Sequence, residues 1–176
     1  MNKQDDAMLK IGWAQADITP DQPVLIAGQF HARVSEGVRD PVTATVLALA
    51  GGGDHAVFVS CDLVSIADEL RDSVRRRLAG RAPGLDPCKV VLHATHTHTG
   101  PEMREPVLNG GTTAGWPGVD LPVMTIDACL DLAATRIADA VIAAWNGRAP
   151  GQIAWGQGQA VVGRNHRENE AISALV

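Results

Sequence analysis

Aromatic residues are scarce in this chain of 176 residues, which has no tyrosine, two phenylalanines and four tryptophans. Proteins that bind single-stranded nucleic acids stack the bases on aromatic side chains, and this sequence offers little for such a surface. It also has no basic excess, because 15 lysines and arginines face 20 acidic residues, for a net charge of −5. We therefore expect no nucleic acid among its partners.

Long apolar runs are also missing. No segment approaches the ~20 apolar residues that a membrane-spanning helix requires, so we expect no transmembrane segment. The first ten residues, MNKQDDAMLK, contain no apolar core of a signal peptide. As written, the sequence therefore predicts a cytoplasmic chain.

Cysteine is rare, and its three copies, Cys61, Cys88 and Cys129, form an odd set without close pairing. Cys61 and Cys88 fall on predicted buried strands, where a free cysteine behaves as a small apolar residue. We expect three reduced thiols. With 45% hydrophobic residues the chain can form one domain with a core, and its 18 glycines and 10 prolines are typical of a loop-rich α/β enzyme.

Alternating and apolar runs predict strands over residues 9–18, 43–50, 55–61 and 89–95. The second and third are separated by a glycine turn and should pair antiparallel. A helix is predicted over 66–79, where Ser65 and Asp68 resemble a capping box. Because this helix connects the third and fourth strands, the sequence predicts a βαβ unit.

The remaining elements are a second helix over 123–145, ended by Asn146 and Gly147, and a weakly alternating strand over 152–162. Between the βαβ unit and the second helix, residues 100–121 predict a long loop. The run Arg75-Arg76-Arg77 is interpreted as a solvated face that complements the dipole of the first helix. The fold class is thus α/β, a mixed sheet with flanking helices.

The most informative motif is His-Ala-Thr-His-Thr-His-Thr-Gly-Pro-Glu, residues 93–102, directly after an apolar strand. Side chains alternate along a strand, so His96 and His98 should point the same way, and two such imidazoles can bind one divalent ion. His93 is out of phase and is more simply a hydrogen-bonded rim residue. A His-x-His motif also occurs by chance, and the spacing alone leaves that alternative open. The sequence nevertheless favours a metal site at the sheet edge.

Asp62 follows the strand over 55–61 and should lie at the same sheet edge as the histidine pair. Two roles are open for it. It could orient a ligand imidazole through a hydrogen bond, or it could cap the turn that follows the strand.

Several segments together resemble the N-terminal catalytic domain of the neutral/alkaline, non-lysosomal ceramidases. The matching segments are Ile11–Gly12, Ala16–Pro20, Ala27–Gly28, Arg33–Pro41, Val59–Leu63, Ala94–Pro101 and Asn165–Arg167. Each is weak alone, but the ordered set is specific and spans nearly the whole chain. We therefore expect residues 1–176 to be the N-terminal part of a larger ceramidase-like domain.

The resemblance implies a zinc-dependent amide hydrolase that cleaves a ceramide-like lipid amide into a fatty acid and sphingosine. It maps a zinc ligand onto His96 and a catalytic residue beside the attacked carbonyl onto His98. Arg167 is the candidate for substrate binding, because His166 occupies the position where the family has arginine. Arg39 likewise stands where histidine is common. Members of this family are often secreted.

The resemblance also implies an incomplete site, because the other family ligands, a histidine, a glutamate and a tyrosine, would follow Val176. A catalytic zinc normally takes three protein ligands, so we expect a fragment that is inactive alone and binds metal weakly. Two alternatives remain. One is a metal-dependent amidohydrolase of another substrate class, such as the barrel type, and the other is a metal-free module without catalysis.

Overall fold

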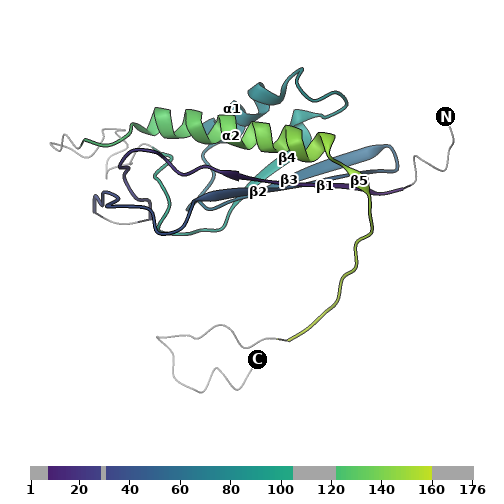
Figure 1. The fold of residues 1–176 in the computed structure, drawn as a ribbon, viewed down its shortest axis with the longest axis horizontal. Coiled ribbons are helices and arrows are strands. Elements are labelled where there is room, and N and C mark those ends of the chain that lie inside the picture. Colours follow the sequence, from purple (N-terminus) through teal and green to yellow (C-terminus); the bar gives the residue numbers. More distant parts are fainter. Residues whose placement is uncertain (1–7, 29–30, 105–121, 160–176) are drawn as a thin grey trace.

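The computed structural model describes residues 8–28, 31–104 and 122–159. They form a five-stranded sheet with both long helices on one of its faces (Figure 1). The predicted class, α/β with a mixed sheet and flanking helices, is confirmed. None of these helices is both long and apolar enough to cross a bilayer.

The sheet has the strand order β4-β3-β2-β1-β5. Its antiparallel centre consists of β1 (Lys10–Asp17), β2 (Thr43–Gly51) and β3 (Asp54–Cys61). On one side β4 (Val90–Ala94) runs parallel to β3, and on the other the short β5 (Ala149–Pro150) pairs with β1. The four strands expected from the apolar patterns are therefore all present.

A tight turn joins β2 to β3. Gly52 and Gly53 both have positive φ, 62° and 80°, which is the combination that two-residue hairpin turns demand and that side chains disfavour. This turn fixes the register, so that β2 and β3 alternate together and present their valines to the same face.

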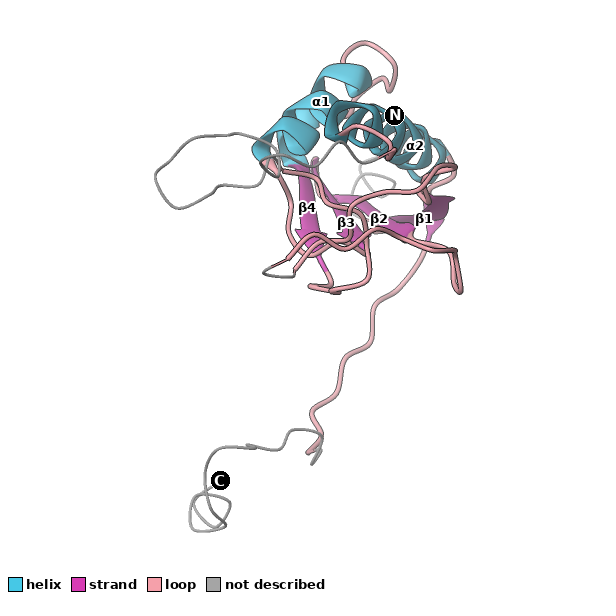
Figure 2. Cartoon of the chain, turned by 90° about the vertical axis from the view of Figure 1, so that its left-hand side faces the viewer, coloured by secondary structure: helices cyan, strands magenta, loops and turns pink. Residues whose placement is uncertain are grey.

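The helices cover the face that these valines occupy. Helix α1 (Asp68–Leu78) connects β3 to β4 and completes the predicted βαβ unit, and α2 (Ile126–Asn146) lies across β1 and β2. Gly12 lets α2 approach closely, because a Cβ at this position would lie 1.9 Å from the carbonyl oxygen of Ala144. Figure 2 shows both helices above the strands.

The core between helices and sheet is apolar throughout, and no polar side chain is fully buried among the described residues. Its largest members are Ile18, Val46, Val57, Val59, Leu63, Leu70, Val74, Leu78, Val90, Ile137 and Val141. Two ion pairs with α2 lie at its exposed edge and add little to stability: Arg77 of α1 pairs with Asp131, and Arg81, in the turn after α1, pairs with Asp139 at 2.8 Å.

The helix ends differ from the prediction. Helix α1 begins at Asp68 after Ala67, whose side chain cannot cap it, so the capping box expected at Ser65 is wrong. Helix α2 begins at Ile126 instead of residue 123, where the Thr125 hydroxyl accepts a hydrogen bond from the Ala128 amide at 3.3 Å. Its predicted end at Asn146 and Gly147 is confirmed.

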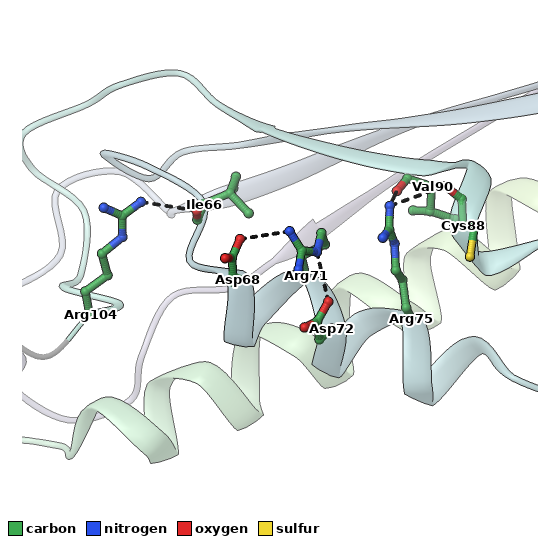
Figure 3. Close-up of polar contacts among 8 residues, drawn as sticks. All are labelled: Ile66, Asp68, Arg71, Asp72, Arg75, Cys88, Val90 and Arg104. Carbon is green, nitrogen blue, oxygen red and sulfur yellow. Dashed lines mark hydrogen bonds and ion pairs between the residues drawn. The ribbon is translucent and has the colours of Figure 1, made fainter.

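The arginine run is not a purely solvated face. Arg75 donates hydrogen bonds to the carbonyl oxygens of Cys88 at 3.3 Å and Val90 at 3.2 Å, which fastens α1 to the start of β4 (Figure 3). Arg77 pairs with Asp131 of α2, and of the three arginines only Arg76 is exposed. Long side chains reach across the helix to neighbouring elements, which helical periodicity alone does not indicate.

Two further expectations are wrong. Cys88 lies exposed in a 3₁₀ turn, Pro87–Lys89, and not on a buried strand; all three cysteines are free thiols, as expected. The strand predicted over 152–162 is absent from its described part, 152–159, and the residues that pair with β1 are Ala149 and Pro150. Positions 160–162 and most of the loop predicted over 100–121 lie outside the described residues.

Candidate functional site

The histidine motif follows β4 and is held in a turn. Strand β4 ends at Ala94, and His96 has a φ of 63°, in the left-handed region. The strand alternation that predicted two parallel side chains is therefore not the reason they meet. They meet nevertheless, because the turn brings the Nε2 atoms of His96 and His98 to 3.4 Å and the ring centroids to 5.0 Å.

The segment after β3 orients His96. Its Nδ1 lies 2.7 Å from the carbonyl oxygen of Val64, and its backbone amide donates to the carbonyl of Leu63 at 3.0 Å. A carbonyl can only accept, so Nδ1 carries the proton. In the neutral ring Nε2 then holds a free lone pair that faces His98. Imidazoles that bind metals are commonly oriented by such a carbonyl.

A second segment, residues 25–34, supports His98. The ring rests on Gly28, where a Cβ would lie 2.6 Å from Nδ1 and where φ is 81°. The Arg33 guanidinium donates a hydrogen bond to the His98 carbonyl. Ala27 donates its amide to the carbonyl of Gly100 at 3.0 Å. Three contacts from one segment thus position the turn that carries His98.

Asp62 lies at this same sheet edge, as predicted, but its carboxylate forms no hydrogen bond with either imidazole. Its Oδ2 accepts hydrogen bonds from the Thr43 amide at 3.1 Å and the Thr43 hydroxyl at 2.7 Å, and Oδ1 accepts from the Thr95 hydroxyl at 3.3 Å. Of its two open roles, the structure favours the rim residue: Asp62 joins the ends of β2, β3 and β4.

The histidine pair has the spacing of two ligands on one zinc ion. Zinc–nitrogen bonds of 2.0–2.1 Å in a tetrahedral arrangement place two ligand nitrogens about 3.4 Å apart. The observed separation of the Nε2 atoms is 3.4 Å, which also suits a weak hydrogen bond between the rings. In the portion of the chain that the structure covers, no group of three or more His, Cys, Asp or Glu side chains is arranged around a metal position. The spacing therefore fits two ligands of one zinc ion, and also one ligand with the second imidazole beside the metal.

A cavity of about 580 Å³ adjoins this turn. Thr99 and Pro101, which follow His98, form one wall. Residues between 19 and 42 form the rest; they include the apolar Val24, Ile26 and Val42 as well as the charged Asp21, Glu36, Arg39 and Asp40. An apolar cleft beside a polar turn can hold a molecule with both kinds of surface.

Some predicted site residues cannot be placed. Arg167, the candidate substrate-binding residue, and His166 lie outside the described residues. Sequence reasoning missed the carbonyl of Val64, which carries no side-chain signal, and the support from Arg33.

Comparison with solved structures identifies the fold. The chain superposes on a crystal structure of neutral ceramidase from Pseudomonas aeruginosa with a TM-score of 0.66 and 21% identity, over 84% of this chain and 23% of that one. A ceramidase complexed with C2 gives a TM-score of 0.61 and 22% identity, over 83% and 22% of the two chains. The fold is therefore that of part of a neutral ceramidase.

The sequence points to the same protein. Neutral ceramidase of Pseudomonas aeruginosa is 32% identical to the chain over 104 residues, which cover 56% of this chain and 16% of that protein. The resemblance inferred from the motifs is thus confirmed, and the chain spans about a fifth of the length of the relatives it matches. No protein-family model matches the sequence.

Proposed function

We propose that this chain contributes the His96–His98 part of a zinc-dependent amide hydrolase that acts on ceramide-like lipid amides. The observation that carries the proposal is the Nε2 atom of His96, which the hydrogen bond from Nδ1 to Val64 leaves unprotonated and which lies 3.4 Å from Nε2 of His98. The resemblance to neutral ceramidase supports the reaction class. A mixed, largely antiparallel sheet does not suit the barrel-type alternative, whose strands run parallel.

Each residue of the turn has a distinct part in this proposal. His96 would hold the metal through Nε2, because Val64 keeps its proton on Nδ1. His98 would stand beside the reacting carbonyl, where an imidazole N–H can stabilise the developing negative charge or pass a proton to the leaving amine. Zinc, when bound, lowers the pKa of its water towards about 7 and polarises the amide carbonyl.

The neighbouring cavity supports the substrate class. Its apolar walls, which include Val24, Ile26 and Val42, lie next to Thr99 of the histidine turn. A lipid amide presents a polar bond flanked by hydrocarbon, so the amide would face the turn while an acyl chain lies in the cavity. Arg167 remains the candidate for the polar end of the substrate.

The test is the zinc content of the purified chain, measured by elemental analysis after equilibration with zinc and removal of the free ion. Because the described residues hold no third ligand, we expect the native chain to retain only part of an equivalent of zinc, and His96→Ala to retain less. His93→Ala is the matched control, because His93 is an exposed histidine three residues earlier on β4. Equal zinc in His96→Ala and the native chain would contradict the ligand assignment.

Hydrolysis of a labelled N-acylsphingosine is then measured separately. Because the site is incomplete, we expect no rate or only a slow one in the native chain. Any rate should fall in His98→Ala, whose zinc content should fall less than that of His96→Ala. Zinc binding without hydrolysis would indicate a metal site that lacks its remaining ligands. A chain that holds no zinc and has no rate would instead favour the metal-free module, in agreement with the absence of a third ligand among the described residues.

A further inference from the structure

The sheet face opposite the helices carries a row of apolar side chains. The strand register aligns Trp13 of β1 with Leu47 of β2, Leu47 with Phe58 of β3, and Phe58 with Val91 of β4. Their strand neighbours Gly12, Val57 and Val90 face the helices and are buried, so the row points to the other side. Figures 1 and 2 show both helices on the opposite side of the sheet.

This face, which we call the open face, is exposed and free of formal charge. Trp13 is 67% exposed, Val91 46% and Phe58 41%. No Asp, Glu, Lys or Arg occurs among its central residues, although such residues make up 20% of the chain. These central residues are Ile11, Trp13, Gln15, Thr45, Leu47, Leu49, Ala56, Phe58, Ser60, Val91 and His93. Depletion of charge and enrichment of aromatic residues are typical of the centre of a protein–protein interface.

The segment after β5 adds to this surface. Gly151 packs on the outward side chain of Ile11, where a Cβ would lie 2.9 Å from Cδ1, so the chain leaves β5 along the open face. The following residues run away on the side of the sheet opposite the helices (Figure 1). They include Ile153 at 59% exposure and Trp155 at 91%. In an extended segment these two side chains point the same way.

We propose that the open face binds the open face of a second copy of this chain, so that two sheets pack into a β-sandwich across a two-fold axis. With the axis parallel to the strands, between β2 and β3, Trp13 of one copy lies opposite Val91 of the other, and Leu47 lies opposite Phe58. The largest side chain thus meets the smallest, which makes the row complementary to itself.

The exposed apolar area supplies most of what such a dimer needs only when the segment after β5 takes part. An aromatic side chain offers about 150–250 Å², so the row together with Ile153 and Trp155 exposes roughly 600 Å² per copy. A standard interface takes about 800 Å² from each partner. The polar residues at the rim supply the difference, and the Ile153–Trp155 segment would lie over the sheet of the other copy.

The experiment is sedimentation velocity on the full chain between about 5 and 200 μM, in reducing buffer. We expect a species of twice the 18.5 kDa chain mass. Phe58→Lys and Val91→Lys should raise its dissociation constant at least tenfold, because each places an unpaired charge in the interface. Val38→Lys is the matched control: Val38 is 61% exposed but lies in the loop between β1 and β2. Its dissociation constant should stay native.

Trp155→Ser tests the proposal even if the two strand variants fail to fold. It changes no strand residue and should also weaken the dimer. A monomer at every concentration would overturn the proposal. If acrylamide then failed to quench the fluorescence of Trp13 in this monomer, residues of the same chain would cover Trp13. A dimer that survives Phe58→Lys and Val91→Lys in folded protein, or one that Val38→Lys weakens equally, would also overturn it.

Discussion

His96 presents an unprotonated Nε2 atom because its Nδ1–H donates a hydrogen bond to the Val64 carbonyl, at 2.7 Å. The two residues lie on separate turns, one after β3 and one after β4. Because β3 and β4 are parallel neighbours, both turns emerge at one edge of the sheet. The pairing of β3 with β4 thus places the Val64 carbonyl where it keeps the proton of His96 on Nδ1. Nε2 is then unprotonated, as a nitrogen that binds a metal must be.

Gly28→Ala should disturb both the backbone and the His98 ring. A side chain at a φ of 81° is strained, and its Cβ would lie 2.6 Å from Nδ1 of His98. We expect a loss of about 1–3 kcal/mol in the free energy of unfolding. Urea unfolding measures the loss, and the histidine Hε1 resonances in NMR spectra should report a displaced ring.

Gly37→Ala is the matched control for this prediction. Gly37 lies in the same N-terminal half, its φ is outside the left-handed region, and a Cβ added there would meet no described atom within 4 Å. Its free energy of unfolding should stay within about 0.5 kcal/mol of the native value. Equal effects of the two substitutions would contradict a specific contact between Gly28 and His98.

Asp62→Asn should weaken the sheet edge without weakening metal binding. The carboxylate accepts hydrogen bonds from the Thr43 amide and from two hydroxyls, and an amide group would turn an NH₂ towards one of these donors. We expect unfolding to become easier by about 1–3 kcal/mol. Zinc affinity of the folded variant should stay within about threefold. A much larger fall would favour the other role, in which Asp62 orients a ligand imidazole.

Only one of the three thiols should react quickly with an aromatic disulfide reagent at pH 8. Cys88 is exposed, whereas burial raises the pKa of Cys61 to about 12 and of Cys129 to about 11. The thiolate is the reacting species, so the two buried groups are protected by ionisation as well as by access. Cys88→Ser should remove the fast phase, and denaturant should expose the remaining thiols. A fast phase that persists in Cys88→Ser would contradict this.

Stability should fall above pH 9, in part because of Cys61. Burial, together with the neighbouring Asp62 carboxylate, raises its pKa from 9.0 to about 12, so the folded state keeps a proton that the unfolded state releases. The stabilisation is complete below pH 9 and is lost as the pH rises towards 12. Guanidinium unfolding between pH 8 and 10.5 should show a smaller decline in Cys61→Ala. The chain has no tyrosine whose ionisation would obscure the effect.

Local patterns were sufficient for most of the framework. The alternation in β1 to β3, the glycine turn before Asp54 and the helical spacing of Leu70, Val74 and Leu78 all depend on neighbours within one element. The βαβ unit followed because short connections restrict the order of elements. Element ends were less predictable, as at Ala67, because tertiary packing can replace a missing cap.

The sequence by itself determined which residues reach the candidate site, since His96, His98 and Asp62 all follow strands that end at one sheet edge. Only the tertiary structure decided how they are arranged there. The Val64 carbonyl, the space above Gly28 and the contacts of Arg33 come from segments distant along the chain, and backbone groups leave no pattern in a sequence. The open face could not be predicted either, because the strand register comes from tertiary structure. An alternating strand shows that one of its sides is apolar. The row of Trp13, Leu47, Phe58 and Val91 forms only when the register of four strands is set.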